Sequence, residues 1–201
     1  MRIKGIFVAM MAVFAMATAA IPAPSRNASM VTGNATSQPI GHYEFCQKYR
    51  SECMVKSANT LPARVTEFGW ETIKKINAEV NERVMPMTDL DIYGRDEVWA
   101  YPAEVGDCED YVLEKRRELM KQGFSASTLL ITVVRKPDGE GHAVLTVRTV
   151  DGDFILDNLA DSVKIWTATP YRYMKRQADN DTGRWVKIEN NTDVVVGSVN
   201  N

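Results

Sequence analysis

The hydrophobic period of this chain changes at Gly123, from the spacing of a helix to that of strands. Between Gly106 and Gly123 the apolar positions recur every three to four residues, which predicts a helix that ends at the second glycine. These positions are Val112, Leu113, Leu119 and Met120. Beyond Gly123, apolar and polar residues alternate instead. Helices followed by a run of strands predict an α+β domain.

The strands expected after Gly123 are short and are separated by turn sequences. PDGEG separates the first two, and Asp151 and Gly152 form a hairpin signal before the third. We expect these strands over 127–136, 142–149 and 153–157, and two more in YRYMKRQ and RWVKIE. Because short turns join antiparallel neighbours, the sheet is predicted to be antiparallel.

A second amphipathic helix is predicted earlier in the chain, over 64–84. Its apolar residues have nearly helical spacing, and Pro86 ends it. They are Val65, Phe68, Ile73, Ile76, Val80 and Val84. The next segment, 85–105, has no clear periodicity and is rich in aromatic and acidic side chains. A loop of that length usually carries function or wraps a cleft.

The first residues of the chain are typical of a secretory signal peptide. Arg2 and Lys4 precede an uncharged run over 6–17 that ends in small residues suited to cleavage. The run is too short to span a bilayer comfortably, so we expect removal of residues 1–20 rather than a membrane anchor. The mature protein would then be exported to the periplasm.

The part of the chain beyond the expected signal peptide is interpreted from its own residues and from the composition and charge of the full sequence. Residues 21–38 are small, polar and proline-bearing, which predicts a flexible leader. Residues 39–201 are then expected to form one domain, in keeping with a hydrophobic content of 45%. The net charge of -2 provides no basic field, so nucleic-acid binding is not expected.

Three cysteines remain in a chain that is headed for an oxidising compartment, and three cannot all pair. Cys46 and Cys53 lie close together in sequence, so we expect a disulfide between them and a free thiol at Cys108. The alternatives are a bridge from Cys108 to either of the others, or three reduced and buried thiols.

The order of Cys108, His142 and Asp157 suits nucleophilic catalysis. A helix N-terminus favours a thiolate, an imidazole takes the thiol proton, and a carboxylate holds the imidazole in the right tautomer. The backbone N–H of Cys108 is available to hold an oxyanion. His142 is the candidate base because the only other histidine, His42, lies beside the expected disulfide.

Each of these residues also has a purely structural interpretation, and the expected hairpin raises a difficulty. A turn on Asp151 and Gly152 puts Asp157 opposite Thr146, on the order of 13 Å from His142. A bulge or a displaced turn would be needed to bring the pair together. Other residues that could orient the imidazole are Asp151, Asp153 and Asn158.

The motifs around these residues resemble a known family. GDCEDY opening a helix that ends in KQG, then GHAVLTV and DFILDN, is similar to the bacterial transglutaminase-like cysteine proteinases, the family of the LapG-type periplasmic proteases. The FC...C segment, DIYGRDEVWAYPAE and PYRYMKRQ...RWVKI also resemble it. The resemblance implies a papain-like or transglutaminase-like fold with Cys108 as nucleophile, His142 as base and Asp157 as orienting acid.

The resemblance also implies calcium dependence, with the carboxylates beside the nucleophile as ligands. Acidic neighbours raise the pKa of a thiol, and a bound Ca²⁺ removes that penalty. The expected ligands are Asp107, Glu109 and Asp110, completed by water and carbonyl groups of the loop over 89–104. The alternative is that Asp107 is an N-cap and that the other two acids favour the first helical turn electrostatically.

In the resembling family the substrates are large surface adhesins, whose release disperses a biofilm, and an inner-membrane receptor for cyclic di-GMP can sequester the protease. We therefore expect a periplasmic cysteine endopeptidase with these partners. Two alternatives remain open. The same triad could serve a cell-wall peptide hydrolase or an amide transferase, or the chain could be a non-catalytic calcium-binding module.

Overall fold

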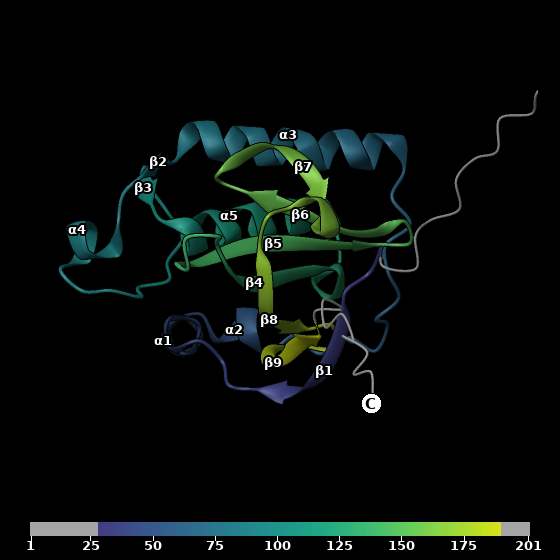
Figure 1. Cartoon of the computed structure of the whole chain (residues 1–201), viewed down its shortest axis with the longest axis horizontal. Coiled ribbons are helices and arrows are strands. Elements are labelled where there is room, and N and C mark those ends of the chain that lie inside the picture. Colours follow the sequence, from purple (N-terminus) through teal and green to yellow (C-terminus); the bar gives the residue numbers. More distant parts are fainter. Residues whose placement is uncertain (1–27, 190–201) are drawn as a thin grey trace, which may run out of the picture.

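A seven-stranded antiparallel sheet forms the centre of the computed structural model, which describes residues 28–189 (Figure 1). In chain order its strands are β1 (Val31–Thr36), β4 (Leu129–Arg135), β5 (Gly141–Thr149), β6 (Gly152–Asp157), β7 (Ala160–Ile165), β8 (Arg172–Ala178) and β9 (Asp181–Glu189). Across the sheet the order is β1-β9-β8-β4-β5-β6-β7. The short strands β2 (Met85–Pro86) and β3 (Val105–Gly106) form a separate parallel pair.

Two long helices, α3 (Glu67–Arg83) and α5 (Cys108–Lys121), pack together and cover one face of this sheet (Figure 1). Three short helices are α1 (Ile40–Lys48), α2 (Arg50–Cys53) and α4 (Asp89–Tyr93). The main core lies between the long helices and the sheet, where Ile73, Leu119 and Leu145 are fully buried. A smaller core on a different set of strand positions includes Val144 and Ile155. The alternation of buried side chains along β5 and β6 places them in the two cores in turn.

The α+β class and the antiparallel sheet predicted from the sequence are confirmed. The helix predicted up to Gly123 is α5, and Gly123 follows its end with φ 90°, a left-handed conformation that glycine adopts readily. The expected strands correspond to β4, β5, β6, β8 and β9. No helix within residues 28–189 is long and apolar enough to cross a membrane.

The sequence pattern wrongly includes Phe68 in the buried stripe of α3. The helix starts only after Thr66, whose side chain accepts a hydrogen bond from the Gly69 N–H. Phe68 precedes Ile73 by five residues, which on a helix places it about 140° away from the buried stripe. Its side chain is accordingly 80% exposed, whereas Ile73 is fully buried.

Strand β1 lies inside the segment 21–38 that the sequence predicts as a flexible leader. As an edge strand of the sheet it pairs with β9, so its order comes from backbone hydrogen bonds rather than from an apolar period. Just before it, the Met30 N–H donates to Asp153 Oδ2 at 2.8 Å, and the Asp153 N–H donates to the Ala28 carbonyl at 2.7 Å. The signal peptide expected over 1–20 lies outside the described residues.

Strand β7 is not predicted from the sequence. Its residues, ADSVKI, are mostly half-buried or exposed and show weak alternation, yet their backbone pairs with β6. The β6–β7 connection matters for the site because Asp157 is the last residue of β6. Asn81 of α3 donates to the Asp157 carbonyl at 2.9 Å, so the helix holds this turn in place.

Candidate active site

His142 and Asp157 form a buried hydrogen-bonded pair between β5 and β6. His142 Nε2 lies 2.9 Å from Asp157 Oδ1, and the two side chains are 4% and 5% exposed. A carboxylate accepts but does not donate, so the neutral ring carries its proton on Nε2. The lone pair on Nδ1 is therefore the basic site of the imidazole.

The observed pairing of β5 with β6 explains how His142 and Asp157 meet. The expectation that Asp157 lies opposite Thr146 is wrong. Gly152 already pairs with Thr149, so the turn comprises the two residues before Gly152. In this register β6 is displaced by two positions toward His142. The distance on the order of 13 Å that the hairpin signal predicts between His142 and Asp157 is therefore not present.

Three donors converge on the Asp157 carboxylate. His142 and the Leu159 N–H reach Oδ1, the latter at 3.0 Å, and Tyr171 Oη donates to Oδ2 at 2.6 Å. Burial raises the pKa of Asp157, but these hydrogen bonds to its charged form outweigh the burial and hold the pKa below its usual value. The acid is therefore ionised and fixed in orientation.

Cys108 is the first residue of α5, and it meets β5 next to His142. The backbone N–H of Ala143 donates to the Cys108 sulfur, which places the thiol beside the strand residue that comes after the histidine. Cys108 is also the free cysteine of the chain. The structure thus brings the three predicted catalytic residues to one end of the sheet, from α5, β5 and β6.

The thiol of Cys108 is held in its protonated form. Burial raises its pKa well above the usual value, and the neighbouring Glu109 carboxylate raises it further, outweighing the Ala143 N–H. The Cys108 thiol lies 2.9 Å from Glu109 Oε2 and donates to it. Neutralising the charge of Glu109 would remove one cause that keeps the thiol protonated, burial being the larger one.

Glu109 belongs to a group of three carboxylates. One oxygen each from Asp89, Asp107 and Glu109 lies within 4.8 Å of the others. Asp89 comes from α4, in the segment that we expected to supply only carbonyl groups to a cation. Asp110, predicted as a ligand, lies outside the group, and its Oδ1 accepts from the Ala100 N–H at 2.8 Å.

The chemistry of this carboxylate group fits a divalent cation that prefers oxygen. Burial raises the pKa of Asp107 to about 8, and it raises those of Asp89 and Glu109 as well. Asp89 Oδ1 and Asp107 Oδ1 are buried and, within residues 28–189, have no hydrogen-bond partner. Asp107 occupies the N-cap position of α5 without making a capping hydrogen bond, so capping does not account for it. Three clustered carboxylates are the type of donor set that Ca²⁺ binds.

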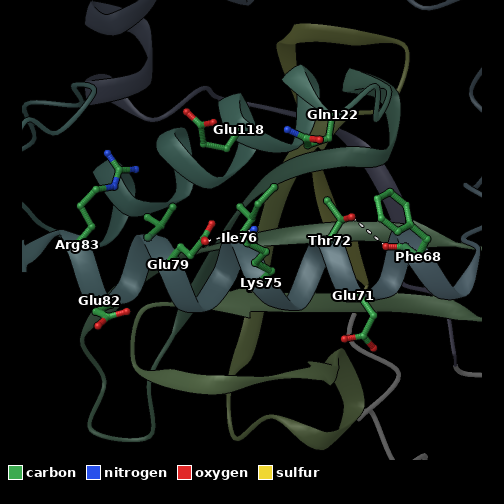
Figure 2. A pocket seen from close by; sticks show the side chains of 11 residues that line it. Phe68, Glu71, Thr72, Lys75, Ile76, Glu79, Glu82, Arg83, Glu118 and Gln122 are labelled. Atoms are coloured by element: carbon green, nitrogen blue, oxygen red, sulfur yellow. Dashed lines mark hydrogen bonds and ion pairs between the residues drawn. The ribbon is translucent and has the colours of Figure 1, made fainter.

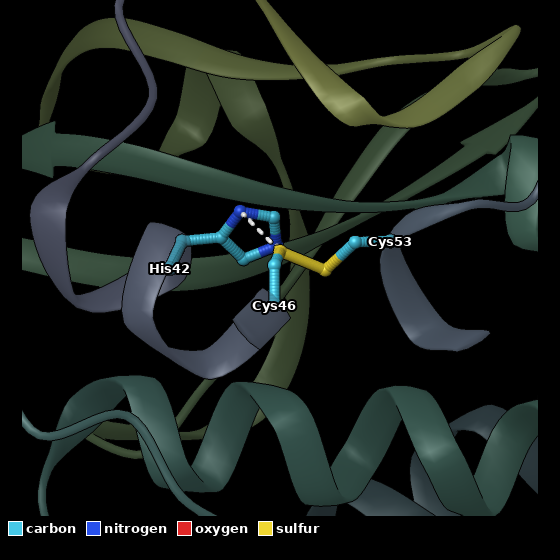
Figure 3. Close-up of side chains that lie close together, drawn as sticks. All are labelled: His42, Cys46 and Cys53. Atoms are coloured by element: carbon cyan, nitrogen blue, oxygen red, sulfur yellow. Dashed lines mark hydrogen bonds between the residues drawn. A yellow bond between two sulfur atoms is a disulfide. The ribbon is translucent and has the colours of Figure 1, made fainter. Parts of the chain in front are cut away.

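Cys46 and Cys53 form a disulfide with an S–S distance of 2.00 Å, the pairing expected from the sequence. His42 lies against it, with Nδ1 3.6 Å from Cys46 Sγ (Figure 3). Trp185 Nε1 donates to the same nitrogen at 3.2 Å, and burial lowers the pKa of His42 to about 3. The neutral, enclosed ring of His42 is a core residue, which leaves His142 as the candidate base.

A groove of about 870 Å³ lies between α3 and α5, away from these residues (Figure 2). Figure 2 shows charged side chains along its rim, among them Glu79, Arg83 and Glu118. None of Cys108, His142 and Asp157 lines it. The groove therefore provides no argument about the chemistry of the triad.

Comparison with known proteins points to one family. Residues 32–193 match the sequence profile described as bacterial transglutaminase-like cysteine proteinase. No curated protein sequence matches the chain. Among solved structures, calcium-bound Legionella pneumophila LapG is similar over 61% of this chain and 73% of its own length, with 24% identity and a TM-score of 0.51.

Two further structures of Legionella pneumophila LapG, one of them EGTA-treated, each match with 26% identity and a TM-score of 0.47. These matches cover 53% of this chain and 62% of the LapG chain, so the chain spans less than two thirds of those relatives. The likeness to calcium-bound LapG supports the fold class expected from the sequence.

Proposed function

Because the chain belongs to the bacterial transglutaminase-like cysteine proteinase family, we propose that it is a calcium-dependent cysteine endopeptidase that cleaves a large surface adhesin in the periplasm. The observation that carries this proposal is the meeting of the free Cys108 with the buried His142–Asp157 pair. The family accounts for the reaction class. The adhesin substrate, the periplasmic location and an inner-membrane cyclic di-GMP receptor are parts of the proposal.

The proposed reaction follows from the protonation states of the triad. Nδ1 of His142 takes the proton of the Cys108 thiol, and the thiolate attacks the scissile carbonyl carbon. The Cys108 N–H, at the start of α5, stabilises the oxyanion that forms. The imidazolium then gives its proton to the leaving amine, and water hydrolyses the thioester to restore the free thiol. Asp157 keeps the imidazole aligned and stabilises its charged form.

Asp89, Asp107 and Glu109 would hold the calcium ion. The bound ion would supply positive charge beside the nucleophile, which lowers the cost of forming a thiolate. Glu109 links the two sites because its carboxylate also accepts from the Cys108 thiol. When Glu109 serves as a ligand, its negative charge no longer raises the pKa of the thiol to the same extent.

The proposal is tested by incubating the purified protein with the N-terminal fragment of a large secreted repeat adhesin from the same genome. We expect cleavage at one site in calcium and no cleavage in EGTA. The products are identified by mass spectrometry. Digestion of muropeptides without adhesin cleavage would assign the triad to cell-wall chemistry. Absence of both activities, with Cys108 as slow to alkylate as a buried thiol, would favour a non-catalytic module.

Tyr171 is a residue of the site that sequence analysis does not identify, and its replacement by phenylalanine is expected to lower kcat about tenfold. The variant loses the hydroxyl donor to Asp157 Oδ2, a charge-assisted hydrogen bond of about 1.5–3 kcal/mol. The pKa of Asp157 then rises, so the acid limb of the kcat/KM profile moves to higher pH. The measurement is a pH–rate profile with one peptide substrate.

Tyr173→Phe is the matched control for Tyr171→Phe. It removes a hydroxyl two residues along the chain that pairs with Thr169 Oγ1 at 2.9 Å. We expect it to leave the acid limb in place. An unchanged profile in Tyr171→Phe would mean that this hydroxyl has no part in orienting Asp157.

A further inference from the structure

Lys115 is a buried cation close to the triad that the proposed reaction does not use. Its side chain is completely inaccessible to solvent, although lysine is almost never fully buried unless it is paired. Its Nζ has no hydrogen-bond partner among residues 28–189. Such an ammonium group is costly unless a nearby negative charge compensates for it.

The position of Lys115 on α5 relates it both to Cys108 and to the strands that carry His142 and Asp157. It follows Cys108 by seven residues, two turns of α5, so the two residues lie on the same side of the helix. This helix packs against β5 and β6, which carry His142 and Asp157. Burial lowers the pKa of Lys115, and the Asp157 carboxylate raises it by a smaller amount. The ring of Tyr111, 5.8 Å from Nζ, is the aromatic neighbour of the ammonium.

The charged residues next to Lys115 on α5 have partners of their own. Glu114 accepts from Arg83 at 2.8 Å and also pairs with Arg117. Arg116 pairs with Glu52 at 3.3 Å. These ion pairs leave Asp157 as the negative charge that acts on Lys115.

Helix α3 supplies neutral polar groups to the same region. Asn81 donates to the Asp157 carbonyl, and Asn77 donates to the Ala160 and Asp161 carbonyls at 3.3 Å each. The Oδ1 atoms of both asparagines are buried and, in the described part of the chain, have no donor. The turn after β6 is therefore held by two amide side chains of α3.

We propose that Lys115 is a positioning residue whose buried ammonium balances the charge of Asp157, and so keeps that carboxylate ionised and aligned on His142. The proposal rests on the triad function given above. Burial lowers the pKa of Lys115 to about 7, and Asp157 raises it, so each charge favours the other. The other titratable groups near Asp157 are His142 and Tyr171, which hydrogen-bond to it, and Tyr173, whose hydroxyl pairs with Thr169 and whose pKa the Asp157 charge raises.

The coupling between Lys115 and Asp157 can be measured without a substrate. In protein labelled with ¹³Cε-lysine, the Asp157→Asn variant removes the carboxylate charge and keeps an oxygen at the same place. We expect the NMR pKa of Lys115 to fall by at least about one unit. Lys121, on the exposed end of the same helix, should not change. An unchanged Lys115 pKa in Asp157→Asn overturns the proposal.

The effect on the reaction is measured with Lys115→Met, which keeps the length of the side chain and removes its charge. We expect kcat to fall about tenfold at unchanged KM, because the pKa of Asp157 rises and the acid limb of kcat/KM moves to higher pH. Lys121→Met, with the same chemical change at an exposed position, should match the wild type.

The outcomes of the two measurements separate the two proposals. If Lys115→Met folds and has the wild-type kcat and the wild-type acid limb of kcat/KM, the positioning role is overturned. A lower melting temperature with an unchanged pH profile of kcat/KM overturns it as well. If the wild-type protein cleaves no substrate, the proposed function fails, and the NMR titration still decides whether Lys115 and Asp157 are coupled. If Lys115→Met does not fold, the NMR titration of the wild type and of Asp157→Asn still tests the proposal.

Discussion

Replacing Cys108 with alanine is expected to lower the rate of peptide cleavage by about 10⁴-fold or more. The variant keeps His142, Asp157 and the carboxylate cluster but has no atom that can form the acyl-enzyme. Its folding should be preserved, since the change removes one sulfur at the start of α5. The measurement is single-turnover cleavage of the adhesin fragment in calcium, compared with wild type at equal concentration.

Cys108→Ser is the matched control because it keeps a hydrogen-bonding side chain of similar size beside Glu109. We expect it to be nearly as inactive as alanine and to have the wild-type melting temperature. The chain has three cysteines, and two form the disulfide, so iodoacetamide should label one thiol in the wild type and none in either variant. Cleavage by Cys108→Ala at the wild-type rate would refute the nucleophile assignment.

The positions of the helices and of the main strands can be predicted from this sequence because local patterns determine them. The helical period before Gly123 and the alternation after it are properties of the chain itself. Strands β1 and β7 have weak patterns of their own, and they form because neighbouring strands supply backbone partners. Pairing of that kind depends on residues far away in the sequence.

The triad residues can be chosen from the sequence, whereas their geometry cannot. Scarcity limits the choice of base, because the chain has two histidines. The distance between His142 and Asp157 depends on which two residues form the hairpin turn, and a difference of two positions decides whether the pair can meet. A dipeptide signal such as Asp151-Gly152 does not fix the register to that precision.

Contacts from distant segments are the part of the site that sequence reasoning misses. Asp89 precedes Asp107 by eighteen positions, and its place in the carboxylate cluster depends on how α4 folds back toward α5. Tyr171 reaches Asp157 from a loop, and Lys115 is fully buried on α5, which packs against the strand that carries Asp157. Lysine in an amphipathic helix is normally read as a solvent-exposed residue, so the sequence contains no signal of its burial.

Removal of calcium is expected to abolish cleavage and to lower the melting temperature by about 5–10 °C. A ligand at one hundred times its Kd stabilises a protein by about 2.7 kcal/mol, and each kcal/mol corresponds to about 2–4 °C at this chain length. The measurement is thermal unfolding in calcium and in EGTA, with cleavage followed in the same samples. Without the ion, burial and the Glu109 carboxylate together keep the Cys108 thiol in its protonated form.

The gain in melting temperature from calcium should increase with pH. In the calcium-free protein the pKa of Asp107 is raised to about 8, so its folded state retains a proton that the unfolded chain releases near pH 4. Its contribution to stability is therefore complete below about pH 4 and is lost as the pH rises toward 8. Calcium competes with this proton, so its effect on stability is small at pH 5 and large at pH 8.

Variants of the carboxylates locate the ion. Asp89→Asn and Asp107→Asn each remove one charge at constant shape, and we expect both to weaken calcium binding at least about tenfold in calorimetric titrations. Asp96→Asn is the matched control, because it removes an exposed charge that acts on Asp89 from a residue that lies outside the cluster. If Asp89→Asn binds calcium like Asp96→Asn, then Asp89 is not a ligand. If EGTA changes neither unfolding nor cleavage of the wild-type protein, the carboxylate group has another role and the thiol must be activated without a metal.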